Sequence, residues 1–157
     1  MQAEISQLEP EVHANSNDFQ KALTLAYRYA QLRQNDRAYQ ILDAMVNNPH
    51  ADGSAVFAAA QMYADVFKDV PKIEVCMEKL VKLIPDQPEA WYNLAATKAA
   101  LGKSTEALQA LKKSLELNSK RLTQGTNQLD LRGELEKDPR FESLRALPEY
   151  KALVAPR

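Results

Sequence analysis

A fixed interval recurs along the chain and sets the strongest limit on what it can fold into. Phe57 and Trp91 are separated by the same interval as Met77 and Leu111. A period of this length, about 34 residues, is typical of repeat proteins, in which each unit is a small supersecondary element that packs against its neighbours. The spacing therefore predicts a series of stacked units rather than one undivided core.

On this period, residues 19–121 divide into three units, namely 19–52, 54–87 and 88–121, with Gly53 treated as one inserted residue. Apolar residues recur at helical spacing in both halves of each unit, which predicts two short helices per unit. A single hairpin could not bury its apolar stripe, but three stacked hairpins share a continuous core. Glycine is scarce, at 4 of 157 residues, which argues against a sheet protein with many tight turns. We expect an all-α fold.

The last unit carries the clearest signals for a helical hairpin. Pro88 suits the first turn of a helix, because the N–H that proline lacks has no partner there. Gly102 suits the end of that helix, because glycine enters the left-handed conformation without a steric penalty. The apolar positions at helical spacing are Trp91, Leu94, Ala95 and Leu101 in the first helix and Ala107, Leu108, Leu111 and Leu115 in the second.

The same unit closely resembles the tetratricopeptide repeat. That family sets a large aromatic residue at the fourth position, leucine at the seventh, a small residue at the eighth, glycine at the fifteenth and alanine at the twentieth. The residues at those positions here are Trp91, Leu94, Ala95, Gly102 and Ala107. The resemblance implies an all-α, right-handed α-solenoid of about three helix-turn-helix repeats, followed by a carboxyl-terminal helical cap.

The other two units match the family pattern less fully. The middle unit keeps Phe57 at the aromatic position but has Lys68 in place of the glycine, and the first unit has Ala22 at the aromatic position. In the last unit, Lys98 stands where the family prefers tyrosine. The resemblance covers about two-thirds of the chain and is strongest in residues 88–121.

Residues 1–18 allow two interpretations. Residues 4–11 suit the last helix of a preceding repeat, and that helix is expected to end at Pro10. In that case the chain is a fragment of a longer array. The alternative is a frayed amino-terminal tail, since the first residues of a domain are often poorly anchored.

Residues 122–157 are expected to form a loop and capping helices. The mostly polar stretch from Ser119 to Gln128 is typical of a connecting loop. Asp138 followed by Pro139 is a strong helix start, because the carboxylate can cap the helix and proline already has a helical φ. A terminal repeat leaves an open apolar face. The side chains available to cover it are Phe141, Leu144, Leu147, Tyr150 and Leu153.

No pattern for catalysis, metal binding or a cofactor occurs, so we predict that the chain is not an enzyme and binds no metal or cofactor. His13 and His50 have no second histidine or cysteine at ligand spacing. Cys76 is the single cysteine and is expected to be a small buried apolar side chain. A phosphate-binding glycine loop and a nucleophile elbow are both missing from the sequence.

The charge balance gives no sign of a charged partner. The chain has 20 Lys and Arg against 21 Asp and Glu, which provides no electrostatic footprint for nucleic acid. The longest uncharged stretch, 53–64, is too short to cross a bilayer as a helix. We therefore expect a protein or peptide partner, without nucleic acid binding or membrane insertion, and we favour the cytoplasm as the compartment.

The resemblance implies that the first helix of each repeat lines a concave groove and that its fifth and ninth positions face a ligand. The residues at those positions are Leu23, Tyr27, Ala58, Met62, Tyr92 and Ala96. All six are uncharged, whereas the family members that clamp a peptide carboxylate use Lys and Asn at such positions. We therefore predict a protein-protein interaction module that binds an apolar peptide or helix in this groove, with the tyrosines and the methionine as anchors.

Two alternatives remain open at this point. The chain could be a structural or oligomerisation segment, in which the apolar groove or an unpaired repeat meets another copy and forms a homo-oligomer. It could also be an accessory domain of a larger enzyme whose catalytic part lies outside this chain. Independently of these alternatives, the six groove residues could simply pack against a neighbouring helix or the chain's own tail.

Overall fold

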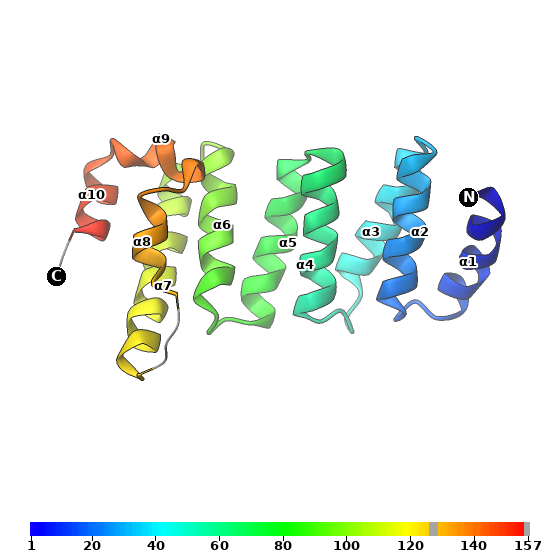
Figure 1. The fold of residues 1–157 in the computed structure, drawn as a ribbon, viewed down its shortest axis with the longest axis horizontal. Helices are drawn as coiled ribbons and strands as arrows, with labels where there is room; N and C mark the ends of the chain where they lie inside the picture. The colour runs from blue at the N-terminus through cyan, green and yellow to red at the C-terminus, as the bar shows by residue number, and fades with distance from the viewer. Residues whose placement is uncertain (126–128, 156–157) are drawn as a thin grey trace. The chain divides into compact units, whose positions relative to one another are not determined.

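The computed structural model describes residues 1–125 and 129–155, and over these residues the chain is all-helical, as predicted (Figure 1). It divides into two compact units, Met1–Cys76 and Met77–Arg157, and the boundary between them falls inside one helix. Within each unit, helices that follow one another across a short turn pack as antiparallel hairpins. Such hairpins are the element from which an α-solenoid of helical repeats is built.

The first unit consists of α1 (Gln2–Ala14), α2 (Phe19–Gln31), α3 (Asn35–Asn47), α4 (Gly53–Met62), the π-helical turn η1 (Tyr63–Phe67) and the first half of α5 (Val70–Leu83). The amino termini of α2 and α4 are each capped by an aspartate. Asp18 accepts a hydrogen bond from the Lys21 amide at 3.1 Å, and Asp52 accepts one from the Ala55 amide at 2.8 Å. These caps satisfy N–H groups that have no partner inside a helix.

The hairpin of α2 and α3 buries one apolar stripe from each helix. The stripes are Ala22, Leu25, Ala26 and Tyr29 on α2 and Ala38, Leu42, Met45 and Val46 on α3. Ala26 and Ala38 are fully buried. Small side chains at these places let the two backbones approach closely, so that larger residues there would overpack the hairpin.

Helix α1 runs through Pro10 instead of ending there, which corrects the predicted boundary. A proline removes one backbone hydrogen bond from a helix interior, and contacts along α1 compensate for that loss. Ile5 is buried, and the Glu11 carboxylate lies 2.9 Å from Lys21 Nζ of α2. This segment is therefore a helix that packs against α2, which favours the interpretation as the last helix of a preceding repeat.

The second unit consists of the second half of α5, α6 (Pro88–Ala100), α7 (Ser104–Thr123), α8 (Leu131–Leu135), the 3-10 turn η2 (Pro139–Phe141), α9 (Glu142–Arg145) and α10 (Pro148–Val154). Helix α7 extends into the stretch from Ser119 that was predicted as a loop, and positions 126–128 of that stretch lie outside the described residues. Packing accounts for the extra turn. Asn118 is fully buried and its Nδ2 donates to Asp130 Oδ1 at 2.8 Å.

The carboxyl-terminal segments α8 to α10 cover the second unit, as a cap was predicted to do. Of the five residues proposed for this role, Phe141, Leu144 and Tyr150 are buried, whereas Leu147 and Leu153 are half-buried. The start at Asp138 is also confirmed, because its carboxylate accepts from the Arg140 amide at 3.0 Å. The helix begins as a 3-10 turn, so the cap is built from short helical segments.

Besides Gly125 after α7 (φ 74°), a residue in the left-handed conformation ends three further helical segments. These residues are Arg33 (φ 59°), Lys68 (φ 55°) and Gly102 (φ 73°). After α6, the amide of Gly102 donates to Ala99 O at 3.0 Å and the amide of Lys103 donates to Lys98 O at 2.9 Å, which is the Schellman pattern. The two units that lack the family glycine thus keep its backbone geometry.

The π-helical turn η1 holds the one extra residue of the middle unit. The aspartates that cap α2 and α4 are separated by one repeat period. The left-handed residues that follow these helical segments, Arg33 and Lys68, are separated by one residue more than that period. The amide of Lys68 donates to Tyr63 O, and such an i to i−5 bond encloses one residue more than an α-turn. The extra residue therefore lies in η1 and not at Gly53. With this adjustment, the division into three repeats remains a prediction.

An aromatic cluster braces η1. The ring centroid of Tyr39 lies 4.6 Å from that of Phe67 and 5.6 Å from that of Tyr63. Tyr39 Oη donates to Asp69 Oδ2 at 2.8 Å, and Tyr63 Oη donates to Asp43 Oδ1 at 2.7 Å. Burial, together with the carboxylate of Asp69, raises the pKa of Tyr39 to about 12. Burial and the carboxylate of Asp43 likewise raise the pKa of Tyr63.

Replacing the two charged left-handed residues by glycine should stabilise the protein. Arg33→Gly and Lys68→Gly each remove the Cβ clash of that conformation and should raise the free energy of unfolding by about 0.5–1 kcal/mol. Gly102→Ala should lower it by about 1 kcal/mol through backbone conformation alone, because no atom lies within 4 Å of the added Cβ. Urea denaturation measures all three. Destabilisation by both glycine variants would show that the side chains make contacts that outweigh the strain.

The tyrosine cluster should make the first unit sensitive to alkali. A phenol whose pKa is raised by folding contributes stability that is present below its ordinary pKa of about 10 and is lost as the pH rises through the folded value. For Tyr39 this loss falls between about pH 10 and 12. The free energy of unfolding should therefore fall less steeply over this interval in Tyr39→Phe than in the wild type. The measurement is the free energy of unfolding from urea denaturation at a series of pH values. Equal pH dependence of the wild type and Tyr39→Phe would contradict a stabilising role of the Tyr39 phenol.

Candidate functional site

The groove positions on α2 form an accessible surface in the first unit. Tyr27 is 47% exposed, and Leu23, one turn earlier on the same helical face, is half-buried. Helix α4 packs beside α2 and exposes Phe57, at 40%, together with Gln61. We call Leu23, Tyr27, Phe57 and Gln61 the α2–α4 surface, which carries no charged side chain.

On α4, the exposed Phe57 and Gln61 each precede a predicted groove position, Ala58 or Met62, by one residue. Met62 is only 8% exposed, and Ala58 is half-buried. The physical reason is the place of the extra residue: α4 follows α2 at the repeat period, and the additional residue comes later, in η1. The α4 residues that lie one period after Leu23 and Tyr27 are Phe57 and Gln61. The exposed residues are therefore those that the corrected spacing selects.

In the second unit, the chain covers its own groove positions. Tyr92 is 6% exposed and Ala96 is 2% exposed. The ring of Phe141 packs edge-on against Tyr92, with centroids 5.0 Å apart, and the Arg140 guanidinium lies 5.5 Å from the Tyr92 centroid. Tyr92 Oη donates to Asp138 Oδ2 at 3.0 Å. Tyr92 is therefore covered by the chain's own cap and Ala96 is buried, so the anchor role of these two residues stays a prediction that would require the cap to move.

Charge fixes the cap to α6 at Asp138. Burial opposes ionisation of this carboxyl, but hydrogen bonds from the side chain and backbone of Arg140 and from Tyr92 hold its pKa below the usual value. Burial and then the bond to Asp138 raise the pKa of Tyr92. At neutral pH, a carboxylate thus accepts from a phenol and a guanidinium. Charge-assisted hydrogen bonds of this kind are stronger than neutral ones. The bond between Tyr92 and Asp138 therefore helps to hold the cap against α6.

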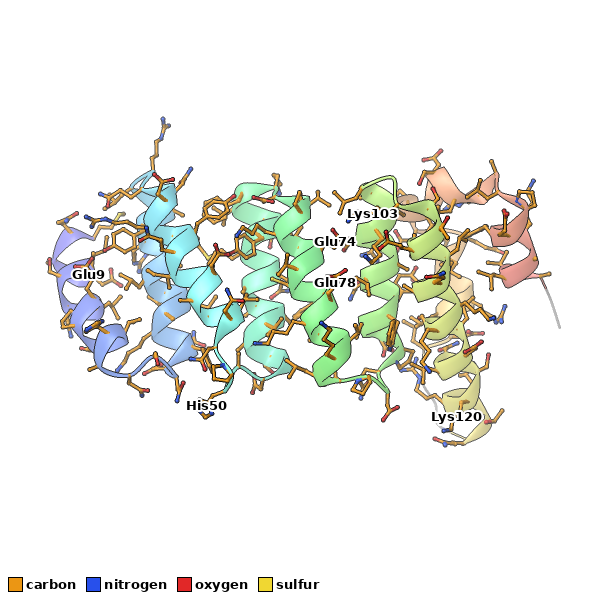
Figure 2. The ribbon with its side chains drawn as sticks, turned by 180° about the vertical axis from the view of Figure 1, so that it is seen from behind. Glu9, His50, Glu74, Glu78, Lys103 and Lys120 are labelled. Carbon is orange, nitrogen blue, oxygen red and sulfur yellow. The ribbon has the colours of Figure 1, made fainter. Side chains whose placement is uncertain are left out.

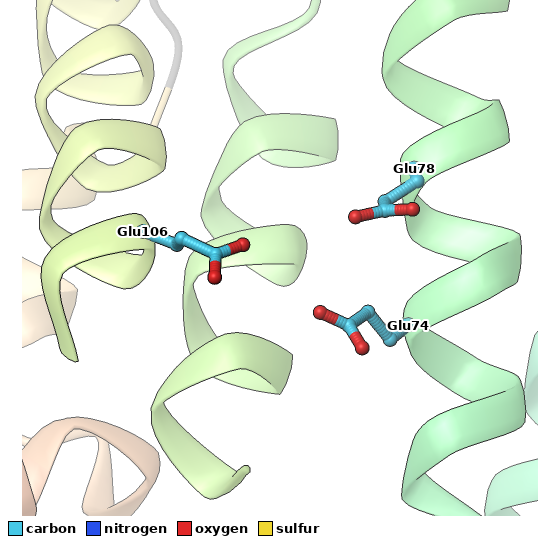
Figure 3. Close-up of side chains that lie close together, drawn as sticks. All are labelled: Glu74, Glu78 and Glu106. Atoms are coloured by element: carbon cyan, nitrogen blue, oxygen red, sulfur yellow. The ribbon is translucent and has the colours of Figure 1, made fainter. Parts of the chain in front are cut away.

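A buried lysine joins α5, α6 and α7 within the second unit. Lys98 is 6% exposed. Its Nζ lies 3.0 Å from Glu78 Oε1 and 2.6 Å from Glu106 Oε2. Figure 3 shows the carboxylates of Glu78 and Glu106 turned toward each other from α5 and α7. Because an ammonium group lies between them, we interpret the two carboxylates as structural partners of Lys98 and not as a catalytic pair.

The remaining chemistry-bearing side chains stand apart from these sites. His13 and His50 are exposed, and Figure 2 labels His50 in the connection between α3 and α4. Cys76 is buried, as predicted. Among residues 1–125 and 129–155, no helix combines the length and the apolar character needed to span a bilayer.

Removing the negative charges of Glu78 and Glu106 should destabilise the second unit strongly, because both carboxylates lie against Lys98. A buried ammonium left without its partners typically costs about 3–5 kcal/mol. Because the two glutamates are about half exposed, we expect roughly 2–4 kcal/mol for Glu78→Gln combined with Glu106→Gln. Urea denaturation measures the change, and Glu116→Gln, on the exposed face of α7, serves as the control. Equal stability of the double variant and the control would contradict the structural role of this cluster.

Comparison with known families identifies one segment of the chain. Residues 88–121 match the tetratricopeptide repeat family. No curated protein and no solved structure matches the chain. Tetratricopeptide repeats generally mediate protein-protein interaction, and the family is typically a non-catalytic interaction module. The match places one tetratricopeptide repeat at residues 88–121, which comprise α6, the turn after it and α7 up to Arg121, in a chain that is all-helical over the described residues.

Proposed function

We propose that the chain binds an apolar peptide or helix of a partner protein on the α2–α4 surface. The observation that carries this proposal is the exposure of two aromatic side chains, Tyr27 and Phe57, on adjacent helices of the first unit. Aromatic residues are enriched at protein interfaces, where they provide a large contact area at a small cost in conformational entropy. Leu23 extends the apolar area along α2.

The chemistry of this surface favours an uncharged ligand segment. Its four residues carry no charge, so a terminal carboxylate or an acidic motif would find no ionic partner among them. Gln61 supplies an amide that can both donate and accept a hydrogen bond. This single polar group suits a backbone N–H or C=O of the bound segment, while Leu23, Tyr27 and Phe57 contact its apolar side chains.

The first unit is the part of the chain that offers these positions to a partner. At the corresponding positions of the second unit, Tyr92 is covered by Phe141 and Ala96 is buried. Binding to them would require displacement of a cap whose Phe141 is fully buried and whose Asp138 is held by Arg140. We therefore place the ligand contacts on α2 and α4.

Binding of a selected peptide tests this proposal. A peptide chosen from a displayed library against the intact chain would be titrated by calorimetry against Tyr27→Ala and Phe57→Ala. Truncation of an interface hot spot typically costs about 2 kcal/mol or more, so each variant should weaken binding by roughly tenfold or more. Leu129→Ala removes an exposed leucine in the second unit and is the matched control. Unchanged affinity in both the tyrosine and the phenylalanine variant would overturn the proposal.

Self-association is the competing use of the same surface. Light scattering over a range of protein concentrations measures the mass of the wild type and of Tyr27→Ala. A mass that does not change with concentration supports a site for a different protein. A wild-type oligomer that Tyr27→Ala dissociates would instead assign the surface to contacts between copies of this chain.

A further inference from the structure

A cleft of about 410 Å³ lies in the first unit between α1 and the hairpin of α2 and α3. Its lining comes from all three helices and from the turn after α1, and consists of Glu9, Val12, His13, Ser16, Ala22, Leu25, Tyr29, Arg37, Gln40, Ile41, Ala44, Met45 and Asn48. Volumes of this order are typical of small-molecule sites, which are mostly apolar with a few convergent polar groups. The groove prediction does not account for this cleft.

Polar contacts join α1 and the turn after it to the α2–α3 hairpin at two places in the lining of the cleft. At the first, Tyr29 Oη donates to Glu9 Oε1, and Arg37 Nη1 lies 3.7 Å from the same carboxylate oxygen; Figure 2 labels Glu9 on α1. At the second, Asn48 Nδ2 donates to Ser16 O at 3.1 Å. The volume of about 410 Å³ suits a small molecule, so we expect a compact occupant.

The middle of the cleft is apolar. Leu25 and Met45 are buried and form part of its floor, while Val12 of α1 and Ile41 of α3 are half-buried along its sides. Ala44 is exposed at its edge. Because the floor is made of the side chains that pack the α2–α3 hairpin, its shape is held by the core and does not depend on a bound molecule.

Two charged side chains of the lining lie against each other. Glu9 and Arg37 form this pair, with the Arg37 guanidinium 5.3 Å from the Tyr29 ring centroid. His13, which also lines the cleft, is exposed to solvent. A charged ligand that entered the apolar middle of the cleft would lose its hydration without an ionic partner there, which is unfavourable. An uncharged ligand meets no such penalty.

We infer that this cleft binds a compact, uncharged, apolar small molecule, about the size of two or three aromatic rings. The site is separate from the α2–α4 surface. At about 3.6 residues per turn, Ala22, Leu25 and Tyr29 lie on the face of α2 roughly opposite to Leu23 and Tyr27. The inference therefore goes beyond the proposed function and can fail independently of it.

A neutral dye and its charged counterpart test the chemistry of the site. Phenylnaphthylamine is uncharged, and anilinonaphthalenesulfonate has the same ring system with one sulfonate added. Fluorescence titration of the intact chain should show binding of the neutral dye, with the anionic dye bound roughly tenfold more weakly or worse. Equal affinity for the two dyes would overturn the inference that the cleft selects an uncharged ligand, and lack of binding of the neutral dye would overturn the site.

Variants that fill the cleft test its location. Ala44→Phe and Ala44→Leu place a larger side chain at its edge without replacing a buried residue, and each should weaken binding of the neutral dye by roughly tenfold. Ala100→Phe and Ala100→Leu introduce the same side chains at an exposed alanine at the end of α6 and should leave binding unchanged. Circular dichroism and urea denaturation verify that the variants fold. Folded Ala44 variants that bind the dye as tightly as the wild type would overturn the assignment to this cleft.

Discussion

The left-handed helix end is the constraint on which the α2–α3 hairpin, the α6–α7 hairpin and the turn from η1 into α5 depend. A helix that stops on such a residue reverses direction within a few residues, so the next helix returns along the first and both apolar stripes face each other. Gly102 adopts this conformation at no steric cost, whereas Arg33 and Lys68 adopt it against their preference. The packing of the hairpins, with Ala26 and Ala38 fully buried at the closest approach in the first unit, holds them there. Tertiary contacts thus impose a backbone geometry that the local residues disfavour.

A single added residue shows how the repeat tolerates variation. In the middle of the chain, the i to i−5 bond from Lys68 to Tyr63 O accommodates this residue in a π-helical turn, and the rings of Tyr39 and Phe67 pack around it. Helix α4 therefore keeps the spacing of α2 up to that turn. Because α4 precedes the added residue, its exposed Phe57 and Gln61 lie at the repeat spacing from Leu23 and Tyr27 of α2.

The two units use equivalent positions differently. The first exposes Tyr27 and Phe57 and also leaves a cleft between α1 and α3, whereas the second covers Tyr92 with the chain's own carboxyl-terminal cap. An uncovered terminal repeat would leave apolar area in water, so a cap is needed for stability. The cap makes Tyr92 part of the core of the second unit, so the proposed binding surface lies in the first unit.

The sequence by itself determined the class of the fold and the place of most helices. The repeat period, the proline at Pro88 and the glycine at Gly102 are local signals, and they predict hairpins because they act through backbone geometry within one turn. The tertiary structure decided the rest. The residues that face solvent on α4 depend on where one extra residue is absorbed, and the burial of Tyr92 depends on Asp138 and Phe141, which lie far away in the chain. The cleft could not be predicted either, because its lining combines residues of three helices and of the turn after α1. No local pattern encodes such spacings, since they follow from packing among side chains distant in sequence.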